Sequence, residues 1–543
     1  MLELRIDKAD LTGRWSYRNG AWVNGGSSIA PFAHPSIETD LLELPEHQLI
    51  VVRENPSAPV LGAGREPGGD AERRIETGDP AAIVASLISW PLNVVVVAFP
   101  KGGDAAVNIY TGMSASAPLF LAPIGHVLRG AWDVADLYPH LPFAVDPGRA
   151  AYTLCHFGLP YSRRTLFPGV QQLTERGVAS WRRADQRLEV CYPAPLLRAM
   201  PRRLAEGADI LAAFETLLGA AIRRSANGGI VASELSGGLD SGVATLVAAR
   251  VLGADRVFSF GLLLPGKQKP SQQARRSELA DRAGVCDMPV DSDALGPFGR
   301  GDIASTDPVI PWGEYYREAF LALGHAIATK GCRVVIRGIG GDEISELTAG
   351  EHESNAGAAG PSAVADRFPG FLTEAAKQAY AVVSEDLDEA PAGFAASSFY
   401  QAAAASAPVY LRRGIWPIYP YGTPEVVDFC RSLPAEWRVD RTLQRSFLRA
   451  SGLSAEVVRP TIPETFLPLR DLMFGGPGAD YVRDIFRRPL LAELGLVDAV
   501  RLNVSFEDAV RRPDAPERAY LLEAATMETM LRTWRRQSEP MGP

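Results

Sequence analysis

The sequence predicts an α+β N-terminal part, then an α/β part with a parallel sheet, and a helical C-terminal part. Three observations predict this order. Short β-rich segments dominate up to about residue 185, helix and strand patterns alternate from about Leu204, and two glycine-rich acidic loops each follow a predicted strand. Because the chain has 543 residues and is 46% hydrophobic, it can form two or three domains. We expect their boundaries at residues 1–190 and 204–543.

Three β-rich segments separated by turn signals are the clearest elements of the N-terminal part. They are Gln48–Arg53 (QLIVVR), Asn93–Phe99 (NVVVVAF) and Ala106–Tyr110 (AVNIY). Short strands between turns are typical of an antiparallel α+β domain.

Helix and strand patterns alternate in the next part of the chain. The predicted helices are Ile210–Arg224, Gly242–Leu252, Ser271–Ala283 and Trp312–Lys330, and the predicted strands are Gly229–Leu235, Val257–Leu264 and Arg333–Arg337. This alternation predicts a parallel, doubly wound sheet that binds its ligand at the carboxyl edge of the strands. The polar stretch Thr348–Gly360 (TAGEHESNAGAAG) predicts a surface loop.

Composition excludes several classes of partner. The net charge is −9 and the pI is near 5.5, so no overall positive field attracts nucleic acid or an anionic membrane. The most apolar stretch, Trp90–Pro100, is too short to span a bilayer. The five cysteines form no CxxC pair and no Cys/His cluster, which indicates buried structural thiols. We expect a cytoplasmic protein without nucleic-acid or membrane partners.

The first candidate site is Ser236–Ser241 (SGGLDS), which directly follows the predicted strand Gly229–Leu235 and opens a helix. Its two glycines let the backbone pass close to phosphates, and the helix N-terminus and two serines offer hydrogen-bond donors. An aspartate among phosphates needs a cation, so we assign Asp240 to magnesium. The alternative is a glycine-rich turn with a helix cap.

A second acidic loop, Gly338–Glu343 (GIGGDE), follows the predicted strand Arg333–Arg337. Parallel strands open onto one edge of their sheet, so both loops should face the same site. Together Asp240 and Asp342 can hold a magnesium ion that neutralises departing pyrophosphate. A glycine turn ending in Asp-Glu is weak evidence alone, but it is strong evidence beside the first motif.

SGGLDS followed about a hundred residues later by GIGGDE resembles the asparagine synthetase-like ATP pyrophosphatases, which include asparagine synthetases, β-lactam synthetases and lasso-peptide macrolactam cyclases. Ser259–Leu262 is similar to the segment that lies against adenine in that family, and Trp416–Leu433 is similar to its segment beyond the nucleotide loops. The N-terminal segments Ile109–Leu121, Trp132–Leu137 and Thr165–Leu173 resemble an amidotransferase-type domain.

The resemblance implies a site for ATP and Mg²⁺ in residues 204–543. The implied nucleotide contacts are Leu235, Ser236, Gly237, Gly238, Asp240, Ser241, Phe260, Gly338 and Asp342. The implied activity is that of an ATP-dependent carbon–nitrogen ligase that forms an acyl-adenylate and releases pyrophosphate.

The N-terminal end departs from the glutamine-dependent members of this family. Those members need a cysteine directly after the initiator methionine, because its amine and thiol hydrolyse glutamine. This chain has Leu2 there, and no cysteine precedes Cys155. We therefore expect residues 1–190 to be a degenerate class II glutamine amidotransferase-like domain, and the amine to come from the substrate itself.

The second loop also departs from the family pattern. Asparagine synthetases have a glutamate and β-lactam synthetases a tyrosine where this chain has Ile339. An intramolecular amine needs less acid–base help, because positioning two tethered groups supplies roughly 7 to 11 kcal/mol of barrier reduction. Lasso-peptide cyclases resemble this pattern best.

A third departure concerns a C-terminal lysine that stabilises the adenylation transition state in the family. The similar segment, Val458–Phe466 (VRPTIPETF), has no lysine, and none lies beyond Lys377. Arg459 or Arg470 could supply the cation as a catalytic residue, although arginine and lysine differ in geometry. The alternative is that both arginines only solvate the surface.

The leading hypothesis is a lasso-peptide cyclase that activates an Asp or Glu side chain of a ribosomal peptide for attack by the N-terminal amine of that peptide. Its expected partners are the precursor peptide, a leader-binding protein and a leader peptidase. The alternatives are a small-molecule amide or β-lactam synthetase and a non-catalytic nucleotide-binding scaffold of a biosynthetic complex. The net charge and the absence of paired cysteines disfavour a tRNA-modifying pyrophosphatase.

Overall fold

Two sheets fill the N-terminal part of the computed structural model, and their strands pair antiparallel except where residues 41–43 pair in parallel with residues 72–74. The structure describes residues 1–11, 13–55, 72–74, 79–102, 106–114, 116–182, 184–226, 229–299, 307–347, 351 and 368–538. The predicted loop Thr348–Gly360 lies outside these residues, except for Glu351.

Each N-terminal sheet has seven strands. The first runs in the order β12 (Gln171–Leu173), β10 (Leu119–Ile124), β11 (Val127–Ala131), β1 (Leu2–Asp7), β4 (Ser27–Pro31), β3 (Ala21–Asn24), β2 (Ser16–Arg18). The second runs in the order β14 (Leu188–Cys191), β13 (Val178–Trp181), β9 (Val107–Thr111), β8 (Val94–Pro100), β6 (His47–Glu54), β5 (Ile37–Glu43), β7 (Glu72–Arg74). The three strands predicted here are confirmed as β6, β8 and β9, and they pair antiparallel with one another.

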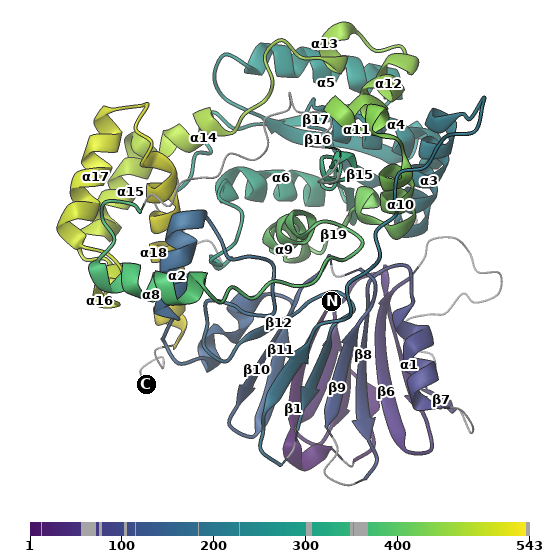
Figure 1. The fold of residues 1–543 in the computed structure, drawn as a ribbon, viewed down its shortest axis with the longest axis vertical. Coiled ribbons are helices and arrows are strands. Elements are labelled where there is room, and N and C mark those ends of the chain that lie inside the picture. The colour runs from purple at the N-terminus through teal and green to yellow at the C-terminus, as the bar shows by residue number, and fades with distance from the viewer. Residues whose placement is uncertain are drawn as a thin grey trace.

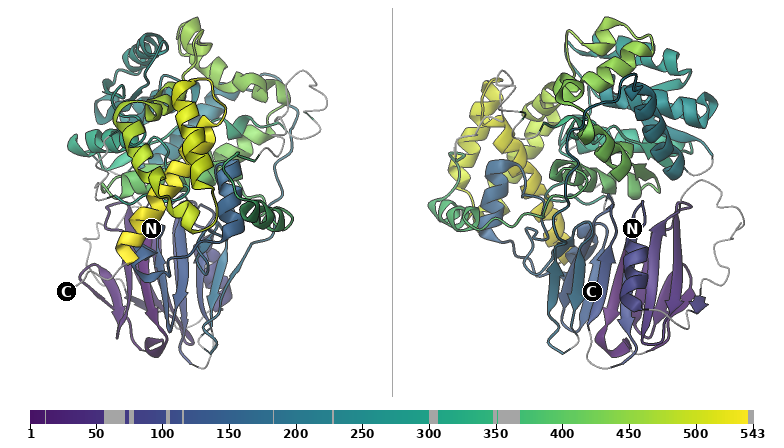
Figure 2. Two further views of the ribbon diagram at one scale, coloured as in Figure 1. Left: turned by 90° about the vertical axis from the view of Figure 1, so that its left-hand side faces the viewer. Right: turned by 45° about the vertical axis from the view of Figure 1, so that its right-hand side comes forward.

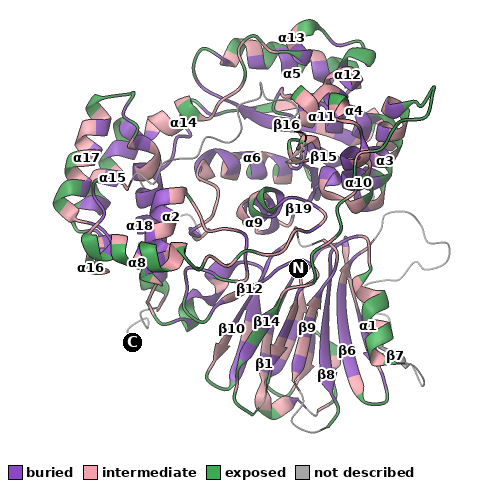
Figure 3. Ribbon diagram, viewed as in Figure 1, coloured by how far each residue is buried: buried purple, intermediate pink, exposed green. Residues whose placement is uncertain are grey.

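The two sheets pack face to face around an apolar core (Figure 1). Leu4 of β1, Ile50 of β6 and Val97 of β8 all belong to that core. Helix α1 (Pro80–Ile88) covers the outer face of the second sheet, where Val84 packs with Val96. The outward side of α1 is exposed, whereas the central strands are mostly buried (Figure 3).

A five-stranded parallel sheet forms the centre of the next part, as the alternation of helix and strand predicted. Its order is β17 (Cys286–Asp291), β16 (Val257–Leu263), β15 (Val231–Glu234), β18 (Val334–Ile336), β19 (Trp416–Ile418). All four pairings are parallel. The carboxyl ends of β15 and β18, which precede the two acidic loops, are therefore neighbours.

Helices cover both faces of this sheet. On one face lie α3 (Ile210–Ser225), α4 (Leu239–Leu252) and α5 (Lys269–Ala283), and on the other lie α6 (Arg317–Thr329) and α9 (Ser397–Leu411). The doubly wound arrangement predicted from the sequence is confirmed.

Helix α6 begins five residues later than predicted, at Arg317 rather than Trp312. The preceding residues form turns, because the amide of Gly313 donates to the carbonyl of Ile310 (3.1 Å). The hydroxyl of Tyr315 donates to the carbonyl of Phe157, 3.0 Å away in the N-terminal part. Tertiary contacts thus override the local helical pattern.

The C-terminal part is helical, as expected. Its helices are α8 (Glu374–Ser384), α10 (Pro424–Ser432), α11 (Ala435–Arg438), α12 (Thr442–Ala450), α13 (Ala455–Val458), α14 (Leu467–Asp471), α15 (Gly476–Arg487), α16 (Leu490–Glu493), α17 (Ala499–Arg511) and α18 (Arg518–Ser538). Helix α2 (Pro147–His156) of the N-terminal part packs against α8 and α18, as the two views of Figure 2 show. Among the described residues, none of the helices combines the length and apolar character needed to cross a bilayer.

The stability of the chain should depend on the buried carboxyl group of Glu523 in α18. Burial raises the pKa of Glu523 from 4.5 to about 8, and this carboxyl forms a hydrogen bond with the hydroxyl of Tyr315. Between these values the folded chain binds a proton that the unfolded chain has released, so the free energy of unfolding should fall as pH rises from 6 to 8. The slope from one group is at most about 1.4 kcal/mol per pH unit.

Glu523→Gln keeps an acceptor for Tyr315 but cannot titrate, so denaturant unfolding at several pH values should show a flatter profile than the wild type. Asp514→Asn, a change at an exposed carboxylate, is the matched control. Identical profiles for the wild type and Glu523→Gln would contradict this origin of the pH dependence.

Candidate nucleotide site

The first glycine loop connects the end of β15 to the start of α4. Gly237 has a left-handed backbone (φ +94°) that favours glycine, and Gly238 is the N-cap residue of α4. The hydroxyls of Ser236 and Ser241 lie 2.9 Å apart, and the amide of Gly238 donates to the Ser236 hydroxyl (3.1 Å). No side chain of the described residues caps α4, so its N-terminus can bind an anion.

The second loop packs directly on the first. A Cβ atom on Gly338 would lie 2.9 Å from the amide nitrogen of Ser241, and one on Gly341 would overlap the side chain of Asp240. Gly340 has φ +98° and lies against Tyr421. Both loops therefore meet at one sheet edge, as their sequence positions predicted.

A buried ion pair joins the bases of the two loops. Glu234 ends β15 and Arg337 follows β18, and the Nε of Arg337 donates to Oε2 of Glu234 (2.6 Å). The hydroxyl of Tyr410 in α9 donates to the other oxygen of Glu234, and the Arg337 guanidinium lies 5.0 Å from the Tyr410 ring centroid. Removing one partner of such a buried pair leaves an uncompensated charge, which costs about 3–5 kcal/mol.

A single guanidinium touches both carboxylates that were assigned to magnesium. Nη1 of Arg441 lies 3.3 Å from Oδ2 of Asp240, and Nη2 of Arg441 forms an ion pair with Asp342. Burial and the charge of Asp342 raise the pKa of Asp240 to about 7, against the opposing effect of Arg441. Two carboxylates close to one another thus share one cation.

Gln444 and Tyr421 form hydrogen bonds that fix the position of Asp240. Nε2 of Gln444 donates to Oδ1 of Asp240 (3.4 Å) and to the carbonyl of Gly341 (2.8 Å), and the Tyr421 hydroxyl donates to the carbonyl of Asp240 (2.8 Å). Sequence reasoning missed these residues and Arg441. The sequence held one signal for Gln444, which is a polar residue among Leu443, Phe447 and Leu448 on the buried face of α12. A buried polar side chain of this kind needs a hydrogen-bond partner.

The residues expected to contact adenine are buried. Phe260 is fully buried, its ring packs in the core shared with α6, and its carbonyl accepts the amide of Leu235 (2.6 Å). The guanidinium of Arg276 in α5 lies beside Gly261 and the carbonyl of Leu235, and it pairs with Asp287 at 2.5 Å. Backbone atoms of Leu235 and Gly261 thus border this end of the site.

The segment expected to carry the missing lysine lies beside the first loop. Arg275 of α5 is 1% exposed and forms an ion pair with Glu464 at 2.5 Å. Its Nε donates to the carbonyl of Gly237 (3.3 Å), and its Nη1 donates to the carbonyl of Ile462 (3.3 Å). Arg275 therefore ties the glycine loop to this segment.

The two arginines predicted as catalytic form ion pairs with residues outside the two glycine loops. Arg459 pairs with Asp440, and its side chain is 62% exposed. Arg470 pairs with the neighbouring Asp471 at 2.8 Å. Within the described part of the chain, no hydrogen bond or ion pair joins either arginine to the two glycine loops. Arg459 reaches the site indirectly, because Asp440 directly precedes Arg441.

Ile339 is partly buried against an apolar cluster. That cluster contains Phe399 and Tyr400 of α9, Tyr419, and Tyr161 of the N-terminal part. The position that carries an acid–base group in the similar families is thus an apolar contact here.

The carboxylate pair suits magnesium. The Arg441 guanidinium already stands between Asp240 and Asp342 as a cation. The described residues contain no cluster of three or more His, Cys, Asp or Glu side chains that could hold a metal ion. Magnesium is usually held by one or two carboxylates together with phosphates, so a two-carboxylate set is the expected kind of site for its nucleotide complex.

Residues 213–380 match the family model described as asparagine synthase. This match supports an asparagine synthetase-like ATP pyrophosphatase, and it covers both glycine loops and the strands that precede them. It indicates ATP-dependent amide-bond ligase chemistry of the AMP-forming type.

Comparison with curated proteins finds no match. Among solved structures, the chain is similar to the U34-tRNA thiolase NcsA from Methanococcus maripaludis with its 4Fe-4S cluster. The identity is 13%, the alignment covers 38% of this chain and 77% of that chain, and the TM-score is 0.20.

Gly341→Ala should destabilise the protein, because the added methyl group would overlap Asp240. Overpacking of this kind costs about 1–3 kcal/mol, which urea unfolding would measure. Gly370→Ala is the control, since no heavy atom lies within 4 Å of its added methyl group. Equal stability of the two variants would show that the loops are not in close contact.

Proposed function

We propose that this chain is an ATP-dependent macrolactam synthetase of the lasso-peptide cyclase type. It activates an Asp or Glu side chain of a ribosomal peptide as an acyl-adenylate, and the N-terminal amine of the same peptide then closes the amide bond. The observation that carries the proposal is the meeting of two acidic glycine loops over the N-terminus of α4, where Asp240 and Asp342 share one cation.

Each part of this site has a role with ATP. The amides of Gly237 and Gly238 and the hydroxyls of Ser236 and Ser241 bind phosphate oxygens at the helix N-terminus. Asp240 and Asp342 hold magnesium, whose charge offsets that of the pyrophosphate leaving group. Leu235, Phe260 and Gly338 border the nucleotide through their backbone.

The second step needs little acid–base chemistry. The amine nitrogen attacks the acyl carbon, the bond from that carbon to the AMP oxygen breaks, and the proton lost by the amine passes to the AMP phosphate. Because amine and adenylate belong to one peptide, holding them together can replace a catalytic acid or base. An apolar contact at Ile339 is compatible with such a reaction.

Residues 1–190 form a degenerate amidotransferase-like domain in this proposal, and residues 204–543 form the synthetase domain. Leu2 occupies the position of the glutamine-hydrolysing cysteine, and its side chain is 0% exposed in the core of β1. The amine therefore belongs to the substrate. A leader-binding protein and a leader peptidase are the proposed partners, because a peptide amine must be released before it can attack.

A small-molecule amide or β-lactam synthetase is the second candidate, and the same loops support it. Pyrophosphate release measured with a panel of precursor peptides and of small amino acids separates the two. Release with peptides alone supports the macrolactam synthetase, and release with amino acids alone overturns it.

Asp240→Asn and Asp342→Asn should each lower substrate-dependent pyrophosphate release by at least about a hundredfold, since each removes one anionic ligand of the same magnesium. Circular dichroism and thermal unfolding should show an intact fold. Asp281→Asn, on the exposed side of α5, is the matched control and should retain wild-type release. Near-normal turnover in either site variant would remove the metal assignment.

Glutamine should neither yield glutamate nor raise product formation. Hydrolysis of its amide requires an accessible nucleophile, and the buried Leu2 offers none. The measurement is glutamate formation with and without ATP and peptide, against a control without enzyme. Glutamate above that control would contradict a purely structural N-terminal domain.

A further inference from the structure

Arg441 contacts the acidic residues of both glycine loops. It precedes α12, and its guanidinium spans Asp240 and Asp342, at 3.3 Å from Oδ2 of Asp240. Its side chain is 37% exposed. A partly exposed arginine keeps the rotamer freedom that it needs to move between neighbouring anions.

The backbone around Arg441 is constrained in an uncommon way. Asp440 and Arg441 both have φ +53°, so two consecutive residues other than glycine adopt the left-handed region. Surrounding contacts enforce this turn. Asp440 pairs with Arg459 and with Arg445 (3.2 Å), and Arg445 also donates to the carbonyl of Asp440 (2.7 Å). Such conformations persist when neighbours over-determine them, and they gather at functional sites.

We propose that Arg441 is the second cation of the adenylation step. In the ligand-free chain it pairs with both Asp240 and Asp342. Asp240 and Asp342 would hold magnesium with its nucleotide, and the guanidinium of Arg441, released from these carboxylates, would donate to the phosphate oxygens beside them. This inference rests on the proposed function, because it names the group that supplies the charge of the absent lysine.

The chemistry of the step requires such a group. An oxygen of the substrate carboxylate bonds to the α-phosphorus, the bond from that phosphorus to the bridging oxygen breaks, and pyrophosphate leaves with the electron pair. No proton is transferred, so the accumulating negative charge must be met by fixed cations. Arginine suits phosphate because its planar guanidinium can donate two hydrogen bonds at once.

The other arginines near the loops are held by partners of their own. Arg275 is locked between Glu464 and Gly237, and Arg276 pairs with Asp287. Arg470 pairs with Asp471. In the described part of the chain, Arg441 alone contacts both carboxylates. Arg459 acts through Asp440 and is therefore a positioning residue.

The test compares Arg441→Ala and Arg441→Lys with Arg449→Ala, a change at an exposed arginine of α12, the helix that Arg441 precedes. Two quantities are measured: Mn²⁺ affinity without nucleotide, by electron paramagnetic resonance, and pyrophosphate release with ATP and peptide. Arg441→Ala should bind Mn²⁺ on the order of tenfold more tightly, because a competing cation is gone. Its pyrophosphate release should fall on the order of a hundredfold or more.

Arg441→Lys should restore part of the pyrophosphate release and keep Mn²⁺ affinity near that of the wild type. The lysine variant keeps the proposal testable if the alanine variant fails to fold. Arg449→Ala should match the wild type in both measurements. Arg459→Ala should lower release less than Arg441→Ala does, since it disturbs only the turn.

Mn²⁺ affinity that is unchanged or weaker in Arg441→Ala would overturn the exchange of cations. Unchanged release in Arg441→Ala, or a comparable loss in Arg470→Ala, would overturn the catalytic role. A wild type that releases no pyrophosphate with any acid substrate overturns the proposed function and the catalytic role together, whereas tighter Mn²⁺ binding in Arg441→Ala would still support the exchange.

Discussion

The close approach of two glycine loops at one sheet edge is the constraint on which the rest of the site depends. Gly338 lies against the backbone of Ser241, and Gly341 lies against the side chain of Asp240. A side chain at either glycine would separate the two carboxylates. The parallel pairing of β15 with β18 brings the loops together, and the buried Arg337–Glu234 pair fixes their bases. The acidic residues can therefore share one cation because the backbone beneath them cannot spread.

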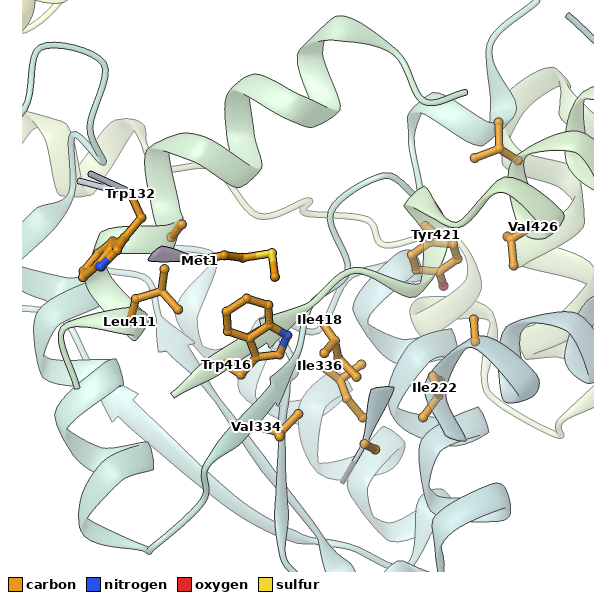
Figure 4. Close-up of a cluster of buried hydrophobic side chains, with 14 of the residues drawn as sticks. Met1, Trp132, Ile222, Val334, Ile336, Leu411, Trp416, Ile418, Tyr421 and Val426 are labelled. Carbon is orange, nitrogen blue, oxygen red and sulfur yellow. The ribbon is translucent and has the colours of Figure 1, made fainter. Parts of the chain in front are cut away.

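The N-terminal part supports this sheet from its edge. Figure 4 shows Met1 and Trp132 beside Leu411 and Trp416, in a cluster that continues through the core. Trp416 begins β19, which pairs with β18, the strand that precedes the second loop. Packing of the N-terminal sandwich thus reaches β18, the strand that precedes the loop of Asp342, through β19. An apolar residue at position 2 suits this supporting role, because a reactive, solvated group there would interrupt the core.

The central strands β15, β16 and β18 and both glycine loops could be predicted from the sequence, because strand, loop and helix follow one another there with local signals, whereas the edge strands β17 and β19 were not predicted. The start of α6 could not be predicted, since Tyr315 is held by Phe157, which follows α2, and by Glu523 of α18, and both lie far away in the chain. Arg441 was equally hidden. Its role depends on a left-handed turn braced by Arg459, and no local pattern reveals which acidic residues a side chain on that turn will meet. The expected nucleotide residue Phe260 was placed correctly in its strand, but its ring faces the core.

In the proposed reaction, charge stabilisation is a larger demand on this site than acid–base catalysis. The proposed adenylation converts a carboxylate and ATP into a mixed carboxylic–phosphoric anhydride and pyrophosphate, so negative charge develops on the phosphoryl oxygens and on pyrophosphate before any amine reacts. The arginines near the loops each pair with a carboxylate. Some of these pairs are buried and permanent, and in the proposal another opens when the nucleotide binds. Arg275 and Arg276 are buried and fixed, and they shape the loops. Arg441 is partly exposed, and it sits on the same acids that magnesium would occupy. A guanidinium in that place offsets part of the repulsion between two neighbouring carboxylates, and it opposes the effects of burial and of Asp342 that raise the pKa of Asp240 to about 7.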